Sequence, residues 1–491
     1  MGEPKKKAMT DASLTTKNNL ASAYDTESFR RWGHELIDLL ADQVAAVQGQ
    51  ADQPVLAYLD PEQAYAFWRA DFAEATTSPT ALFQRILTQS IQLHHPHYLG
   101  HQVSVPALVS GLAGLVSDVL SNGTGVYEMG MASNAIERVV TEFTAQQIGY
   151  PEEAGGFLTS GGTLANLTAL LAARQAKAPT PVWETGHAQR LAILVSEEAH
   201  YCVDRAARIL GMGAQGILKV PVDEQFRIQI DDLEATYQRA RAAGLVPIAV
   251  VGCAGATATG SYDDLEALAE LAQRHQLWFH VDGAHGGAVV FSEKYRHLVR
   301  GIARADSVVI DYHKMGMTPA LNTALLFRDG ADAYRTFAQR AQYLWEAQQS
   351  PEWYHSGKKT FECTKLMLSI KVYAILRTHG KDVFGKNVDR LYDQAKVLAQ
   401  LIHQHPDLEL ALSPAANIVN FRYVSCPAEV RDERNARIRQ ALVEAGDFYV
   451  VQTLIRGQRY LRCTVMNPLS DERVFAQLLA RVVAVGKSLA Q

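Results

Sequence analysis

A regular alternation of strand-like apolar runs with amphipathic helices is the feature that most constrains how this 491-residue chain can fold. Between residues 96 and 375, helix-period segments such as 166–174 and 262–274 separate short runs rich in β-branched residues. These runs lie at 192–196, 216–220, 247–251, 277–281, 307–310 and 320–327. The order predicts an α/β domain with a largely parallel sheet wrapped by helices, whose ligands bind at the carboxyl ends of the strands.

The segments on either side have other patterns. Residues 21–95 predict two helices, which alone bury little and are expected to pack on another surface, such as that of a partner subunit. After a long helix over 364–403, strands are expected near 418–423, 449–454 and 460–465, followed by a helix over 471–485. The expected divisions are a disordered leader (1–20), an N-terminal helical segment (21–95), a large domain (96–375) and a small C-terminal α+β domain (376–491).

Composition narrows the classes of function. Apolar residues make up 48% of the chain, which is enough for a large core, and the formal charge of -5 gives no electrostatic case for nucleic-acid binding. No apolar run approaches the roughly 18 residues of a membrane span. The five cysteines are scattered and form no C-x-x-C pair, so we expect reduced thiols and a cytoplasmic protein.

Two charged residues follow predicted strands and suggest a cofactor. Lys314 comes just after the run 307–310, and Asp282 ends the run 277–281. Pyridoxal 5'-phosphate (PLP) needs such a pair, because the lysine forms a Schiff base and the carboxylate keeps the pyridine nitrogen protonated, so that the ring can accept electrons. The plain alternatives are a surface lysine and a turn or helix-capping aspartate.

A second group of residues suits the other parts of PLP. Ser160, Gly161, Gly162 and Thr163 open a predicted helix, where backbone N–H groups and the helix dipole attract a phosphate; the alternative is an ordinary helix cap. Further candidates are a small residue that lies flat against the ring, a strand-end histidine that stacks on it, and two residues that could reach the phosphate: Ala284, His200, Ser307 and His313.

A cluster of histidines precedes the large domain. His94, His95, His97 and His101 have none of the usual zinc spacings, and no cysteine accompanies them. We therefore expect no metal site, and interpret the segment as a loop near the substrate pocket.

Along the sequence these motifs are Ser160–Thr163, His200, His280–Ala284 and Asp311–Lys314. In this order they resemble those of the PLP-dependent group II amino-acid decarboxylases, which act on glutamate, aromatic L-amino acids, diaminobutyrate and cysteine sulfinate. The resemblance extends from about residue 90 to residue 470. It implies the PLP-dependent transferase fold type I, with a large PLP domain, a small C-terminal domain and an N-terminal segment that packs across an obligate homodimer with shared active sites.

The resemblance also implies roles for single residues. Lys314 resembles the Schiff-base lysine, Asp282 the pyridinium partner and His200 the stacking histidine. The remaining positions resemble the threonine near the 3'-oxygen (Thr257), the phosphate shell (Gly161, Gly162, Thr163, Ser307, His313), the arginine that holds the α-carboxylate (Arg462) and the loop tyrosine that protonates the carbanion (Tyr343). Relatives with phenylalanine in place of this tyrosine form aldehydes, so Tyr343 favours plain decarboxylation.

The expected reaction is loss of CO2 from an amino acid through a Lys314 Schiff base and a quinonoid intermediate, with a proton returned by Tyr343 or His200. The loop 98–104 offers His101 and Gln102 to the substrate, which favours a polar or acidic side chain: glutamate, aspartate, cysteine sulfinate or diaminobutyrate. The alternatives are an aromatic substrate, another fold type I enzyme (a carbon–sulfur lyase, an aldolase or an aminotransferase) and a non-enzymatic binding protein.

Overall fold

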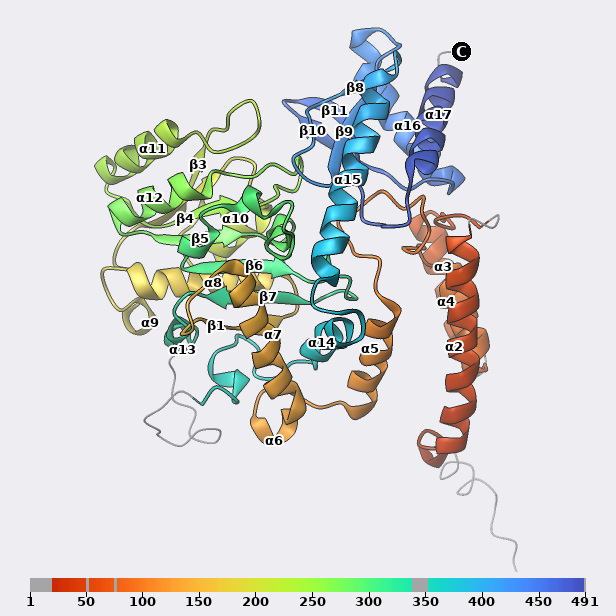
Figure 1. The fold of residues 1–491 in the computed structure, drawn as a ribbon, viewed down its shortest axis with the longest axis horizontal. Coiled ribbons are helices and arrows are strands. Elements are labelled where there is room, and N and C mark those ends of the chain that lie inside the picture. Colours follow the sequence, from red (N-terminus) through yellow and green to blue (C-terminus); the bar gives the residue numbers. More distant parts are fainter. Residues whose placement is uncertain (1–19, 50–52, 75–76, 338–351, 490–491) are drawn as a thin grey trace, which may run out of the picture.

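The computed structural model describes residues 20–49, 53–74, 77–337 and 352–489. Figure 1 shows three parts: a body of strands and helices, a smaller layer of strands with the last helices, and a separate column of N-terminal helices. None of the helices in these ranges is both long enough and apolar enough to cross a bilayer.

The body contains a seven-stranded sheet of order β1-β7-β6-β5-β4-β2-β3. Its strands are β1 (Gly155–Thr159), β2 (Leu191–Ser196), β3 (Ile217–Val220), β4 (Val246–Cys253), β5 (Trp278–Asp282), β6 (Ser307–Asp311) and β7 (Thr323–Phe327). The five strands from β3 to β6 in this order are parallel, and β7 is antiparallel to both β6 and β1. The predicted α/β fold with a largely parallel sheet is confirmed.

Helices cover both faces of this sheet, which explains why its strands are apolar without interruption. In β6, Val309 faces α8 (Gly162–Lys177) and α10 (Tyr201–Ile209), whereas Val308 and Ile310 face a core that includes α7 (Ala132–Ile148) and α12 (Leu265–His275). Because side chains alternate along a strand, residues of one strand contribute to both cores.

Strand β1 was not predicted. It begins Gly155-Gly156, a pair typical of a turn, yet Gly156 is required within the strand because a β-carbon there would collide with the carbonyl oxygen of Leu325 on β7. Since β1 is antiparallel to β7, it runs in the same direction as β6 and ends at the same edge of the sheet.

The smaller layer is an antiparallel sheet of order β10-β11-β9-β8, with β8 (Leu408–Leu410), β9 (Ile418–Tyr423), β10 (Val451–Ile455) and β11 (Gln458–Thr464). Helices α16 (Arg431–Ala445) and α17 (Glu472–Ser488) pack with it. The single long helix predicted over 364–403 is wrong: α14 (Leu368–His379) ends at Gly380, whose φ of +91° favours glycine, and α15 (Val383–Gln404) follows. The boundary expected after residue 375 therefore falls inside α14.

The N-terminal column comprises α2 (Thr26–Gln48), α3 (Pro61–Ala73) and α4 (Pro79–Thr88), each capped by the side chain of Asp25, Asp60 or Ser78. Figure 1 shows it to one side of the body. The structure buries little of its apolar surface: Phe29, Tyr65 and Phe72 are all exposed.

Candidate active site

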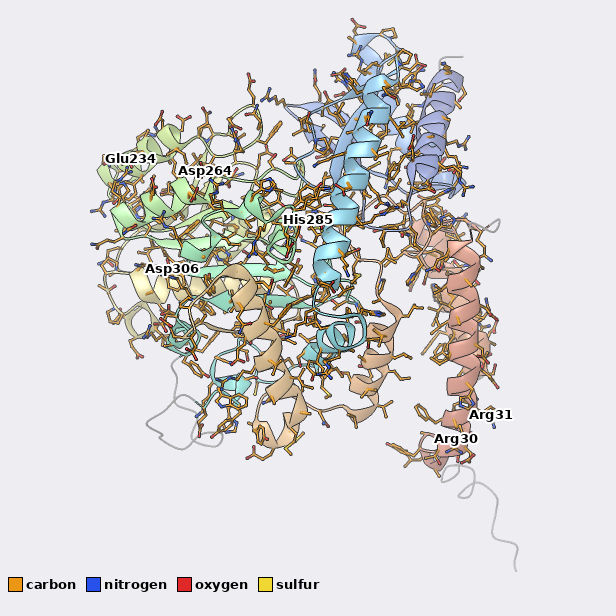
Figure 2. The ribbon with its side chains drawn as sticks, in the orientation of Figure 1. Arg30, Arg31, Glu234, Asp264, His285 and Asp306 are labelled. Atoms are coloured by element: carbon orange, nitrogen blue, oxygen red, sulfur yellow. The ribbon has the colours of Figure 1, made fainter. Side chains whose placement is uncertain are left out.

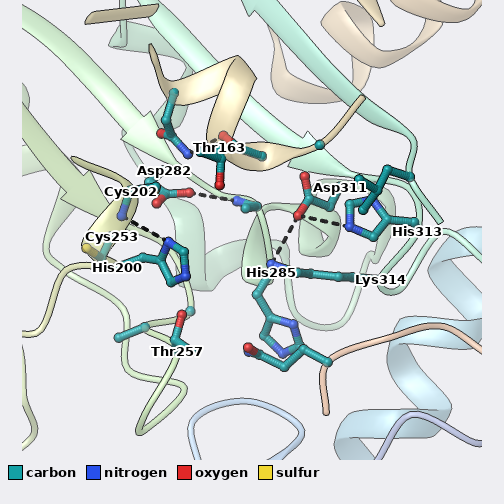
Figure 3. Close-up of a pocket in the computed structure, with 18 of the residues that line it drawn as sticks. Thr163, His200, Cys202, Cys253, Thr257, Asp282, His285, Asp311, His313 and Lys314 are labelled. Carbon is teal, nitrogen blue, oxygen red and sulfur yellow. Dashed lines mark hydrogen bonds and ion pairs between the residues drawn. The ribbon is translucent and has the colours of Figure 1, made fainter. Parts of the chain in front are cut away.

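A cavity of about 250 Å³ lies at the edge of the large sheet where β1, β4, β5 and β6 end (Figure 3). Parallel strands bring their carboxyl ends to one edge, which explains why residues distant in sequence meet there. The predicted residues that line it are Gln102, Ser160, Gly161, Gly162, Thr163, His200, Thr257, Asp282, Ala284, His313 and Lys314.

The segment between β1 and α8 forms an anion cradle. Gly161 has a φ of +122°, which favours glycine, and α8 begins at Gly162, so the positive end of this helix borders the cavity. The Ser160 hydroxyl donates to Oε1 of Glu362 at 2.8 Å, and the Thr159 hydroxyl donates to Oε2 at 3.0 Å. Ser160 therefore lines the cavity with its proton already committed to a carboxylate.

Asp282 and His200 lie on the opposite side of the cavity from Lys314 (Figure 3). Asp282 ends β5 and accepts a hydrogen bond from the Ala284 N–H at 3.2 Å. His200 precedes α10, and its Nδ1 accepts the Cys202 N–H at 3.3 Å, so a neutral ring carries its proton on Nε2. Burial holds the pKa of His200 below its usual value.

Lys314 forms an ion pair with Asp311, which was not predicted as a site residue. Its Nζ is 3.0 Å from Oδ2 of Asp311, and Nε2 of His313 is 3.6 Å from the same oxygen. The other oxygen of Asp311 accepts the Thr323 hydroxyl proton at 2.6 Å. The available sequence signal was an acidic residue directly after the apolar run 307–310, three residues before Lys314.

Ser307 does not reach this cavity. It begins β6, whereas Asp311 ends it, so the two are separated by about 13 Å at the usual rise of a strand. The buried Ser307 hydroxyl contacts Trp278 Nε1 at 2.9 Å and His280 Nδ1 at 2.8 Å. The expectation that Ser307 contacts a phosphate is therefore wrong.

The predicted substrate residues differ in position. Gln102 lines the cavity, and its Nε2 is buried without a partner among the described residues. Arg462 does not line the cavity itself, but its Nη1 donates to the carbonyl oxygen of Thr257, which does, at 2.8 Å. His101 is exposed and packs near Tyr449, outside the cavity lining. Tyr343 lies outside the described residues.

Sequence reasoning also missed His285. This buried histidine lines the cavity at the junction with the smaller layer (Figure 2), where its Nε2 donates to Oδ1 of Asn417 at 2.7 Å. Burial lowers its pKa to about 3, so the ring is neutral and Nδ1 is left as an acceptor. In the sequence His285 follows Gly283 and Ala284, and this short pattern is too common to indicate a site residue.

These groups fit the three reactive parts of PLP. The cradle at Gly161 and Gly162 suits a phosphate, Lys314 supplies an amine for the aldehyde, and Asp282 supplies a carboxylate for the pyridine nitrogen. When bound, the cofactor supplies an electron sink for carbanion chemistry at an amino acid Cα.

Comparisons with known proteins agree with this fit. The model of the pyridoxal-dependent decarboxylase conserved domain matches residues 81–424. An aromatic-L-amino-acid decarboxylase of Bacillus atrophaeus is 26% identical over 477 residues (94% of this chain, 96% of the relative), and an L-2,4-diaminobutyrate decarboxylase of Acinetobacter baumannii is 28% identical over 420 residues (82% of each). The crystal structure of mouse CSAD superposes with a TM-score of 0.87 at 24% identity, covering 94% of this chain and 99% of that one. The chain belongs to the pyridoxal-dependent decarboxylase family, and is a PLP-dependent amino-acid decarboxylase.

Proposed function

We propose that this enzyme decarboxylates an L-amino acid with a polar or acidic side chain. The observation that carries the proposal is the lining of the cavity: Gln102 offers a buried, unpartnered amide N–H, and no phenylalanine, tyrosine or tryptophan is among the described residues that line it. A buried polar group left unpaired is costly, so the cavity favours a substrate that can bond to it. An aspartate 1-decarboxylase of Aliivibrio fischeri, 29% identical over 449 residues, is a relative with such a substrate.

The proposed roles follow from the arrangement of the side chains. Lys314 carries the cofactor, the cradle at Gly162 binds its phosphate, and Asp282 keeps its ring nitrogen charged. His200 lines the cavity with its Nε2–H free of the bond to Cys202, which supports the proposal that it stacks on the ring. Thr257, Ala284 and His313 also line the cavity and are proposed to contact the cofactor.

Two further roles concern the substrate. The Arg462 guanidinium, anchored at one nitrogen by the Thr257 carbonyl, is proposed to bind the α-carboxylate with its remaining N–H groups. Tyr343 is proposed to return a proton to Cα.

The test is CO2 release from a panel of L-amino acids that includes cysteine sulfinate, with Lys314→Ala as the control. We expect turnover of at least one polar candidate, and loss of both turnover and the visible absorption of bound PLP in the variant. Release of CO2 from tyrosine or tryptophan alone would favour the aromatic alternative, for which the Bacillus atrophaeus relative speaks. Pyruvate, ammonia or a keto acid in place of CO2 would reject decarboxylation.

The assembly and the location complete the proposal. A homodimer with shared active sites, packed through residues 21–95, would cover the exposed Phe29, Tyr65 and Phe72. The two domains expected at 96–375 and 376–491 remain a proposal, in which the boundary moves from residue 375 to the end of α14 at His379. All five cysteines are free thiols, which supports a cytoplasmic location.

A further inference from the structure

Two carboxylates line the cavity, and their surroundings differ. Asp282 is partly exposed and accepts one hydrogen bond, from the Ala284 N–H. Asp311 is buried, and both of its oxygens are occupied: Oδ1 by the Thr323 hydroxyl at 2.6 Å and Oδ2 by Lys314 Nζ at 3.0 Å. Carboxylates in different environments commonly serve different roles in one site.

The contacts of Asp311 hold it firmly in place. Its backbone N–H donates to the carbonyl oxygen of Ala284, and a β-carbon at Gly162 would lie 3.1 Å from its Oδ1. The carboxylate is therefore wedged between the start of α8 and the Lys314 side chain. Because Thr323 on the neighbouring strand β7 fixes Oδ1, Oδ2 is left to face Lys314 Nζ at 3.0 Å and, at 3.6 Å, Nε2 of His313.

We propose that Asp311 is a positioning residue and the counter-ion of the Lys314 nitrogen. The carboxylate fixes where this nitrogen lies and stabilises a proton on it, including when the nitrogen is joined to PLP as a Schiff base. Asp282 is then left to the pyridine ring. The inference rests on the proposed role of Lys314.

Other charged and titratable groups face Lys314 from every side of the cavity, and their contributions differ from that of Asp311. They are His200 and Cys202 at the start of α10, Cys253 and Asp282 as the last residues of β4 and β5, His285, His313 and, beyond Thr257, Arg462. His200 and His285 have lowered pKa values because they are buried, so both are neutral near pH 7. Asp311 is the carboxylate in direct contact with Nζ.

The test is a pH titration of the visible absorption band of the PLP-loaded protein, without substrate. The band is replaced by near-ultraviolet absorption when the Schiff-base nitrogen loses its proton. Asp311→Asn keeps an oxygen for Thr323 but removes the charge, so we expect the transition about one pH unit lower than in the parent, a tenfold weaker hold on the proton. Asp311→Ser, smaller beside Gly162, serves as a second neutral variant and is expected to shift the same way.

Asp306→Asn is the matched control. This variant removes the charge of another carboxylate, which accepts a hydrogen bond from the Phe279 N–H at 2.7 Å. Figure 2 shows Asp306 well away from His285 of the cavity. Its transition should coincide with that of the parent. An unchanged transition in both Asp311 variants would overturn the proposal, as would variants that fold but bind no PLP. Absence of the band from the parent protein would instead count against the role of Lys314.

Discussion

Two buried polar residues of strand β6 show how position along one strand determines whether a side chain reaches the active site. Ser307 and Asp311 are the first and last residues of β6, and both are buried polar residues. Asp311 borders the cavity, whereas the Ser307 hydroxyl joins Trp278 and His280 in the interior. A further hydrogen bond of 2.7 Å joins His280 Nε2 to Oδ1 of Asn166. The Ser307 hydroxyl therefore belongs to a buried hydrogen-bond network.

Replacement of Ser307 by alanine should therefore lower stability without weakening cofactor binding. It leaves the Trp278 N–H without its acceptor in the interior and takes the hydroxyl away from His280 Nδ1, which keeps only a longer contact of 3.2 Å with the Ser307 carbonyl oxygen. We therefore expect the free energy of unfolding to fall by about 1–3 kcal/mol. Denaturant unfolding and a PLP titration measure the two effects. Ser160→Ala, which removes an exposed hydroxyl, should change stability far less. Weaker PLP binding by Ser307→Ala at unchanged stability would contradict this assignment.

At the scale of elements, a segment distant in sequence secures the edge strand β1. Lys359 Nζ donates to the carbonyl oxygen of Gly156, and Lys365 Nζ donates to that of Leu158, two residues further along the same edge. Between them, Glu362 accepts the hydroxyl protons of Thr159 and Ser160. Charged side chains thus bind backbone carbonyl groups on the edge of β1 that has no neighbouring strand among the described residues. They also hold the end of β1 where the anion cradle begins.

Lys365 also forms a buried ion pair, 2.7 Å from Glu137, with side chains only 3% and 6% exposed. Lys365→Met leaves the glutamate charge buried without its partner, so we expect a loss of about 3–5 kcal/mol in the free energy of unfolding. Adding Glu137→Gln should recover part of this loss. The surface pair of Lys386 and Asp382 provides the control, because Lys386→Met should cost little. Equal effects of the two lysine substitutions in denaturant unfolding would refute the argument.

The same elements show what the sequence could reveal. Lys314 and Asp282 were predictable because each follows an apolar run that is recognisable by itself. Strand β1 was not, since Gly156 is set by contact with β7 and has no local signal. The placement of Arg462 beside Thr257, and of His101 away from the cavity, depends on how the small sheet docks against the large one, which local patterns do not encode.

Across the whole molecule, exposed apolar side chains gather on helix α5 (Leu108–Leu120) and on the N-terminal column. Helix α5 packs against α14 on one side and exposes apolar side chains at helical spacing on another: Leu108, Leu112, Leu115, Val116 and Val119. The N-terminal column carries similar exposed residues. Monomeric proteins rarely expose contiguous apolar patches of more than a few hundred Å².

We therefore expect a second copy of the chain to cover the exposed apolar residues of α5. Charged side chains introduced among these residues should then separate the two copies. Leu112 and Val116, each 51% exposed and one turn apart, are the sites to change. We expect the parent to sediment as a dimer and the variant with Leu112→Asp and Val116→Asp as a monomer, because two carboxylates would be desolvated in the interface. Leu454→Asp changes a leucine on β10 of the small sheet that is 59% exposed, and should leave the dimer intact. A parent that sediments as a monomer, or a double variant that stays dimeric, would show that another surface covers this helix.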